Sequence, residues 1–119
     1  MAITPSETFT RFHNDIEEKL QEITNSDQRT DFYELIDKAT NLKNPIISRY
    51  GSELKELHKL RNIIEHDKSN RHPDIALPTE YAINRISKIA NLLIILQATL
   101  FFVPVEVVQF LVVPAIRCL

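Results

Sequence analysis

The residues best suited to chemistry lie in a segment whose spacing of apolar side chains predicts a helix over residues 52–66. Arg61 falls within the apolar stripe of this helix, so its guanidinium is expected beside the core. Asn62 and His66 are four residues apart and therefore share a different face. The basic and imidazole side chains closest to that face are Lys55, His58 and Lys59.

The composition of this segment suits a small anion site. Between residues 55 and 72 the sequence has five Lys and Arg against three Asp and Glu, together with three of the four histidines. A bias of this size could hold one phosphate group but is too small for a long nucleic-acid groove. An imidazole can move protons near neutral pH, and a guanidinium can donate paired hydrogen bonds to phosphate oxygens.

Structural roles for the same residues also agree with the spacing. Arg61 could extend along the core towards solvent, or pair with Glu34 or Asp37 of the preceding predicted helix. His66 could be a cation favoured by the helix dipole in the last helical turn. His13, which stands beside an apolar stripe, is expected to be a packing or surface residue.

The sequence does not favour metal or nucleophile chemistry. Side chains of metal-ligand type follow the predicted helix at Glu65, His66, Asp67, His72 and Asp74. They include no histidine pair four residues apart and no zinc-protease motif, so we expect no metal and no cofactor. No serine or cysteine stands in a recognisable nucleophile motif, and a chain with Gly51 as its only glycine has no phosphate-binding glycine loop.

The run Leu60-Arg61-Asn62-Ile63-Ile64-Glu65-His66 resembles the signature of the HEPN superfamily. These are small helical-bundle domains in which Arg and a polar residue precede a His that stands four to six residues after the Arg. The run ends the third main predicted helix and is followed by a polar loop and one more apolar helix, a layout similar to HEPN domains across roughly residues 5–97. HEPN toxins paired with nucleotidyltransferase antitoxins commonly have a tyrosine two residues beyond the His, where this chain has Lys68.

The resemblance implies metal-independent cleavage of RNA by a homodimer of toxin or defence type. Arg61 and His66 of two protomers would meet at a cleft, and Asn62 would orient the histidine or the phosphate. Attack of a ribose 2′-OH on its own phosphodiester would leave a 2′,3′-cyclic phosphate and a free 5′-OH. Substrate contacts are expected from Lys55, His58 and Lys59.

The resemblance also leaves room for other partners and for another function. An antitoxin or regulatory protein is a further expected partner. Since family members without catalytic activity are common, the alternative function is a non-enzymatic helical dimerisation or regulatory interaction module.

The elements that must position these residues are four amphipathic helices. Thr4-Pro5-Ser6-Glu7 is typical of a capping box and predicts a first helix to about Thr24. A second helix is expected to stop at Asn44-Pro45, and Gly51-Ser52 predicts a kink or break before the third. Thr79 is the expected N-cap of the last helix.

The spacing of apolar residues in these helices predicts the fold class. The predicted stripes of the first, second and last helices are Phe9, Phe12, Ile16, Leu20 and Ile23; Phe32, Leu35, Ile36, Ala39 and Leu42; and Ala82, Ile83, Ile86, Ile89, Ala90, Leu93 and Leu96. Because each stripe must be buried against the others, the sequence predicts an all-α, antiparallel four-helix bundle. The resemblance implies that this bundle is HEPN-like.

Charge is distributed unevenly along the 119 residues. Residues 1–98 carry 28 of the 30 charged side chains, which predicts a bundle over 1–98 and an apolar C-terminal tail, or the start of a truncated second domain, over 99–119. A membrane span through this tail is disfavoured by Pro104 and Glu106, so the tail is expected to cover an apolar surface.

Overall composition sets limits on compartment and partners. The formal net charge of −2 excludes a polycation that binds nucleic acid through its global charge. The single Cys118 cannot form an intrachain disulfide, and the N-terminus lacks the features of a signal peptide. We therefore expect a cytoplasmic protein that does not act in a membrane.

Overall fold

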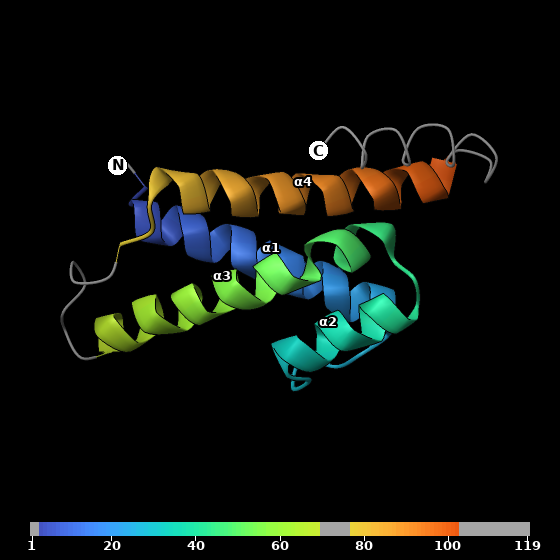
Figure 1. The fold of residues 1–119 in the computed structure, drawn as a ribbon, viewed down its shortest axis with the longest axis horizontal. Coiled ribbons are helices and arrows are strands. Elements are labelled where there is room, and N and C mark those ends of the chain that lie inside the picture. Colours follow the sequence, from blue (N-terminus) through green and yellow to red (C-terminus); the bar gives the residue numbers. More distant parts are fainter. Residues whose placement is uncertain (1–2, 70–76, 103–119) are drawn as a thin grey trace.

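The computed structural model describes residues 3–69 and 77–102, and all regular secondary structure in these residues is α-helical (Figure 1). The helices are α1 (Pro5–Thr24), α2 (Phe32–Asn41), α3 (Pro45–Ser69) and α4 (Glu80–Phe102). The predicted all-α four-helix bundle is therefore confirmed. α3 runs antiparallel to α2 and α4, whereas α1 and α4 run in the same direction (Figure 1). α1 and α3 each contact all three other helices, so the bundle is built around these two.

Each helix begins where a side chain can accept backbone N–H groups. The hydroxyl of Thr4 accepts from the backbone of Glu7 at 3.1 Å, and the Glu7 carboxylate accepts from the backbone of Thr4 at 3.3 Å, which is the predicted capping box. Asp31 caps α2, and Thr79 caps α4 by accepting from Ala82 at 3.1 Å. Such caps typically contribute about 1 kcal/mol each.

Two predicted boundaries near α3 differ in the structure. α2 ends at Asn41, and Lys43 has a φ of 61°, so Leu42 lies beyond the helix and is 61% exposed instead of buried. Asn44 then starts α3, because its Oδ1 accepts from the backbone N–H groups of Ile46 and Ile47. α3 is one continuous helix across Gly51-Ser52, so of the two expected alternatives the break is not formed.

Gly51 allows α3 to approach α2 closely. A Cβ atom at this position would lie 3.2 Å from Cγ2 of Ile36 and 3.7 Å from Cγ2 of Ile47. Glycine in a helix interior costs about 1 kcal/mol relative to alanine. Close packing of the two helices offsets that cost, which is why the helix is not broken here.

The core lies between the four helices and confirms most of the predicted stripes. Its buried apolar side chains are Phe9, Ile16, Leu20, Phe32, Leu35, Ile36, Ala39, Ile46, Ile47, Tyr50, Leu54, Leu57, Ile64, Ala82, Ile86, Ile89, Ala90, Leu93 and Leu96. At its edge the guanidinium of Arg85 on α4 binds both carboxylate oxygens of Glu53 on α3 at 2.7–3.1 Å. This bidentate pair holds α3 and α4 together.

The last helix passes the predicted domain boundary. α4 continues beyond residue 98 to Phe102, because a fall in charge density does not by itself end a helix. The rest of the predicted tail, 103–119, lies outside the described residues. Among the helices in the described ranges, none is long and apolar enough to cross a membrane.

Candidate functional site

A pair of hydrogen-bonded histidines lies inside the bundle where α1, α2 and α3 meet. Nε2 of His13, on α1, is 2.9 Å from Nδ1 of His58, on α3. His13 is fully buried and His58 is 6% exposed. The ring of Phe32 stacks on both imidazoles at centroid distances of 4.6 and 4.5 Å, and the ring of Tyr33 meets His58 edge-on at 5.1 Å. The two imidazoles are thus fixed in place by α2.

Both imidazoles are neutral at neutral pH. Burial lowers the pKa of His13 to about 3, and the positive charge of Arg61 and the neighbouring His58 lower it in the same direction. Burial, followed by the charge of Arg61, also lowers the pKa of His58. A buried imidazole resists protonation because the charged form loses its hydration.

Arg61 lies half-buried beside these rings, as its place in the apolar stripe predicts. Its Nε is buried and has no hydrogen-bond partner among the described residues. The predicted ion pair with Glu34 or Asp37 is not formed, because those carboxylates pair with Lys38 at 3.7 Å and with Lys55 at 3.2 Å. Within residues 3–69 and 77–102, the Arg61 guanidinium therefore has no carboxylate partner.

Asn62 and His66 are both exposed and share one face of α3, as predicted from their spacing. The side-chain nitrogen Nδ2 of Asn62 is 3.3 Å from Nε2 of His58, so the exposed amide is connected to the buried imidazoles. Next to His66, the carboxylate of Glu65 lies 3.5 Å from the hydroxyl of Thr10 on α1.

The three predicted substrate contacts have different surroundings. Lys55 pairs with Asp37, and Lys59 pairs with Glu56 at 3.0 Å, a hydrogen bond that raises the pKa of Lys59. Both ammonium groups remain partly exposed. His58 is not on the cationic face, because its ring points into the bundle towards His13.

The sequence left open whether His13 packs in the core or lies at the surface, and the structure buries it completely. Phe9, His13, Ile16 and Leu20 follow one another at steps of four, three and four residues and are all buried. That spacing puts the imidazole in the middle of the apolar stripe and could have revealed its burial. Its contact with His58 could not be found this way, because the two residues are 45 positions apart.

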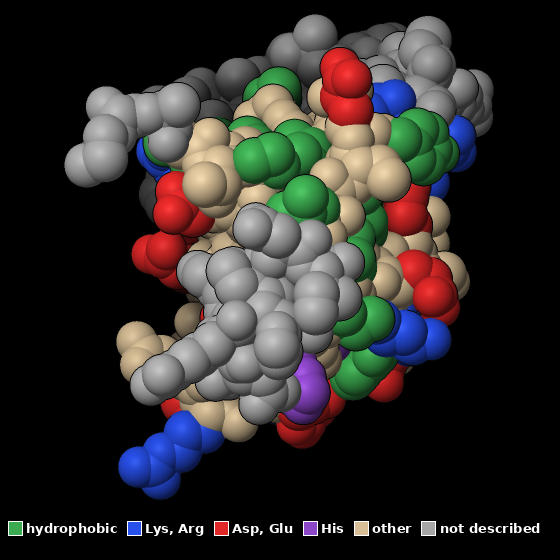
Figure 2. All heavy atoms as spheres, turned by 90° about the vertical axis from the view of Figure 1, so that its left-hand side faces the viewer, with side chains coloured by type: hydrophobic (Ala, Val, Ile, Leu, Met, Phe, Trp, Pro, Cys, Tyr) green, Lys and Arg blue, Asp and Glu red, His purple; other side chains and the backbone are tan. Residues whose placement is uncertain are grey.

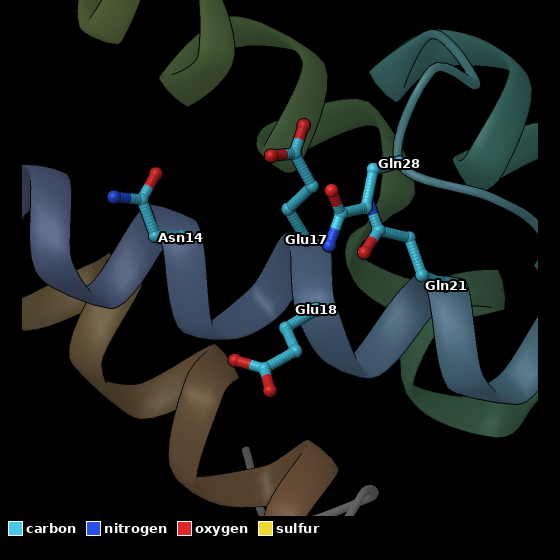
Figure 3. Close-up of a pocket in the computed structure, with 5 residues that line it drawn as sticks. All are labelled: Asn14, Glu17, Glu18, Gln21 and Gln28. Carbon is cyan, nitrogen blue, oxygen red and sulfur yellow. The ribbon is translucent and has the colours of Figure 1, made fainter.

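No group of three or more metal-ligating side chains occurs within the part of the chain that the structure describes. The other predicted side chains of metal-ligand type, those of Asp67, His72 and Asp74, lie outside that part. A hollow of about 520 Å³ elsewhere is lined by Asn14, Glu17, Glu18, Gln21 and Gln28 (Figure 3). Its two carboxylates, which point away from each other in Figure 3, would repel a phosphate.

Large apolar side chains are exposed on α3 and α4. They are Ile63 on α3 and Tyr81, Ile94 and Ile95 on α4, and Leu77 is exposed just before α4 begins. Figure 2 shows apolar side chains gathered on the upper half of the bundle end at which α4 begins. Exposed apolar surface of this kind is typical of a protein–protein contact.

No family model, curated protein or solved structure matches this chain.

Proposed function

We propose that this protein is a metal-independent endoribonuclease of toxin or defence type that acts in the cytoplasm as a homodimer. The observation that carries the proposal is the state of Arg61: a half-buried guanidinium with a buried Nε and no carboxylate partner in the described ranges. An unpaired cation in this position has donors available for an anion. Asn62 follows it directly, and His66 is one turn beyond Asn62 on the surface.

The chemistry proposed for these residues is transfer of an RNA phosphodiester to its own ribose 2′-OH. His66 accepts the proton of the 2′-OH or donates one to the leaving 5′-oxygen, and a histidine of the second protomer supplies the complementary transfer. Arg61 donates hydrogen bonds to the phosphate oxygens as negative charge develops on them. The 5′ P–O bond breaks as the 2′ O–P bond forms, leaving a 2′,3′-cyclic phosphate and a free 5′-OH.

Lys55 and Lys59 contribute to RNA binding by leaving their present carboxylate partners. Ion pairs between exposed side chains are worth about 0–1 kcal/mol, so a phosphate can replace Asp37 or Glu56 at little cost. His58 does not contact the RNA in this proposal, because its ring is buried.

A second candidate function is a non-enzymatic dimerisation or regulatory module. The exposed apolar side chains of α3 and α4 favour it. One of them, Ile63, is 53% exposed and directly follows Asn62 on α3. In this alternative an antitoxin or regulatory protein covers that surface, and Arg61 has no catalytic role.

Single substitutions separate the two functions. His66→Ala should reduce cleavage of single-stranded RNA about 10²–10⁴-fold, the usual contribution of a general acid–base group, and Arg61→Ala should cause a similar loss. Arg49→Ala, which removes an exposed arginine from the same helix, should leave cleavage unchanged, and EDTA should have no effect. Purified wild-type protein that leaves RNA of several sequences intact at pH 6–8 would favour the interaction module.

A further inference from the structure

The solvent-facing stripe of α4 changes character towards the end of the helix. Asn84, Lys88 and Asn91 follow one another at steps of four and three residues, so they share this stripe, and the two asparagines are exposed. The stripe continues with Ile95, which is 59% exposed, and Ile94 beside it is 44% exposed. Polar side chains stay hydrated at such positions, whereas adjacent isoleucines are stabilised there only when another apolar surface covers them.

We propose that the face formed by Ile94 and Ile95 is the docking surface for residues 103–119 of the same chain. This is the apolar surface that the sequence leads us to expect beneath that segment. Such docking does not depend on the proposed ribonuclease function. The exposed apolar side chains of α3 and of the first turn of α4 remain available to a separate partner.

The segment begins close to this face and is long enough to cover it. α4 ends at Phe102, seven residues after Ile95, a stretch of helix about 11 Å long at a rise of about 1.5 Å per residue. The 17 residues that follow span about 25 Å as a helix and about 56 Å when fully extended. Either length passes both isoleucines if the chain turns back along α4.

The sequence after Phe102 favours such a change of direction. Pro104 has no backbone N–H and disfavours the helical conformation for the residue before it, which accounts for the end of α4. A chain that leaves the helix at this point does not continue along its axis. Attachment to the end of α4 also gives the segment an effective concentration on the order of millimolar at the face, an advantage that a separate molecule lacks.

The composition of the segment matches the surface. Residues 103–119 contain only two charged side chains, Glu106 and Arg117. Docking on Ile94 and Ile95 removes the apolar surface of the helix and that of the segment from water in one contact. If the α4 helix of a second copy covered the isoleucines instead, the segment would still need another apolar surface. The segment itself is therefore the occupant that satisfies both requirements.

Methyl NMR on the full chain tests the docking directly. All six valines of the chain lie within 103–119, so a valine-specific methyl label reports on this segment alone. Nuclear Overhauser effects should connect valine methyls with the methyls of Ile94 and Ile95, and none should reach Ile63 of α3. Absence of any effect to Ile94 and Ile95 would overturn the proposal. Effects between differently labelled chains in a mixed sample would assign the contact to a second copy and would overturn it as well.

Limited proteolysis of a double variant measures how firmly the segment is held. Ile94→Lys combined with Ile95→Lys should leave the helical circular dichroism unchanged but speed chymotrypsin cleavage after Phe110 or Leu111 by about tenfold or more, because burial of the two side chains is lost. Ile63→Lys, at an isoleucine of α3 that is 53% exposed, is the matched control and should leave the rate unchanged. Equal rates for the double variant and the wild type would contradict the docking. Loss of the Overhauser effects on addition of phosphatidylcholine vesicles would identify lipid as the preferred partner and would contradict it too.

Discussion

Lowering the pH from 7 to 5 should destabilise the folded protein through His13. Burial and the neighbouring Arg61 depress the pKa of this imidazole from its ordinary value of 6.5 to about 3 in the folded state. Between these two values the unfolded chain binds a proton that the folded chain does not. Stability is therefore greatest above pH 6.5 and is lost as the pH falls towards 3.

The size of the effect follows from the separation of the two pKa values. Each unit of separation is worth about 1.4 kcal/mol, and between pH 7 and 5 the unfolded imidazole becomes almost fully protonated while the folded one stays neutral. His13 alone should therefore lower the free energy of unfolding by about 2 kcal/mol between pH 7 and pH 5. The pKa of His58 is lowered as well, so this residue adds to the loss with the same sign.

Urea denaturation followed by circular dichroism at pH 7, 6 and 5 measures this loss directly. Protein concentration and ionic strength must be held constant, because a dimer gains apparent stability with concentration. His13→Gln removes the titrating group while keeping a hydrogen-bond donor. Its loss of stability between pH 7 and 5 should be about 2 kcal/mol smaller than that of the wild type.

Ile16→Val provides the matched control for a general weakening of the core. It should lower stability by about 0.5–1.5 kcal/mol at every pH without changing the pH dependence. A His13→Gln protein that loses as much stability on acidification as the wild type would refute the argument, because His13 would then titrate alike in the folded and unfolded chains.

Two further predictions concern helix packing and assembly. Gly51→Val should lower the free energy of unfolding, measured by urea denaturation, by about 1–3 kcal/mol, because the valine side chain would collide with Ile36. The stability of Gly51→Ala should lie within about 1 kcal/mol of the wild type, because the gain in helix propensity offsets the 3.2 Å contact of the added Cβ with Ile36. Equal stability of Gly51→Val and the wild type would contradict this packing. Sedimentation should show a homodimer at concentrations on the order of tens of micromolar, and a monomer there would exclude a cleft shared by Arg61 and His66 of two protomers.

The helices could be predicted from the sequence because their signals are local. The capping box at Thr4 spans one turn, and successive residues of the stripe from Phe9 to Leu20 are one turn apart. Boundaries depend on more distant packing. Gly51 alone favours a break, but contact with Ile36 of α2 keeps α3 continuous. Leu42 fits the apolar spacing of α2, yet the left-handed conformation of Lys43 ends the helix before it.

The candidate site could be predicted only in part, for the same reason. The half-buried position of Arg61 follows from its place in a stripe, and the shared face of Asn62 and His66 follows from their spacing. The lack of a carboxylate partner for Arg61 among the described residues could not be predicted in this way, because Lys38 and Lys55 pair with the carboxylates of α2. The burial of His58 depends on its contact with His13 of α1, and no pattern within α3 predicts that contact.

Stability alone does not explain the polar groups beneath Asn62. Each buried donor or acceptor without a partner costs about 1–3 kcal/mol, and both Nδ1 of His13 and Nε of Arg61 are in this state. Apolar side chains of similar volume at these positions would avoid the cost. Ser6 Oγ and Tyr50 Oη are likewise buried without a partner among the described residues, so this state is not confined to the second half of α3. Of these four groups Arg61 is the one that carries a charge, and a charged group left unsatisfied at the edge of a core is expected to be functional, which supports assigning the chemistry to the second half of α3.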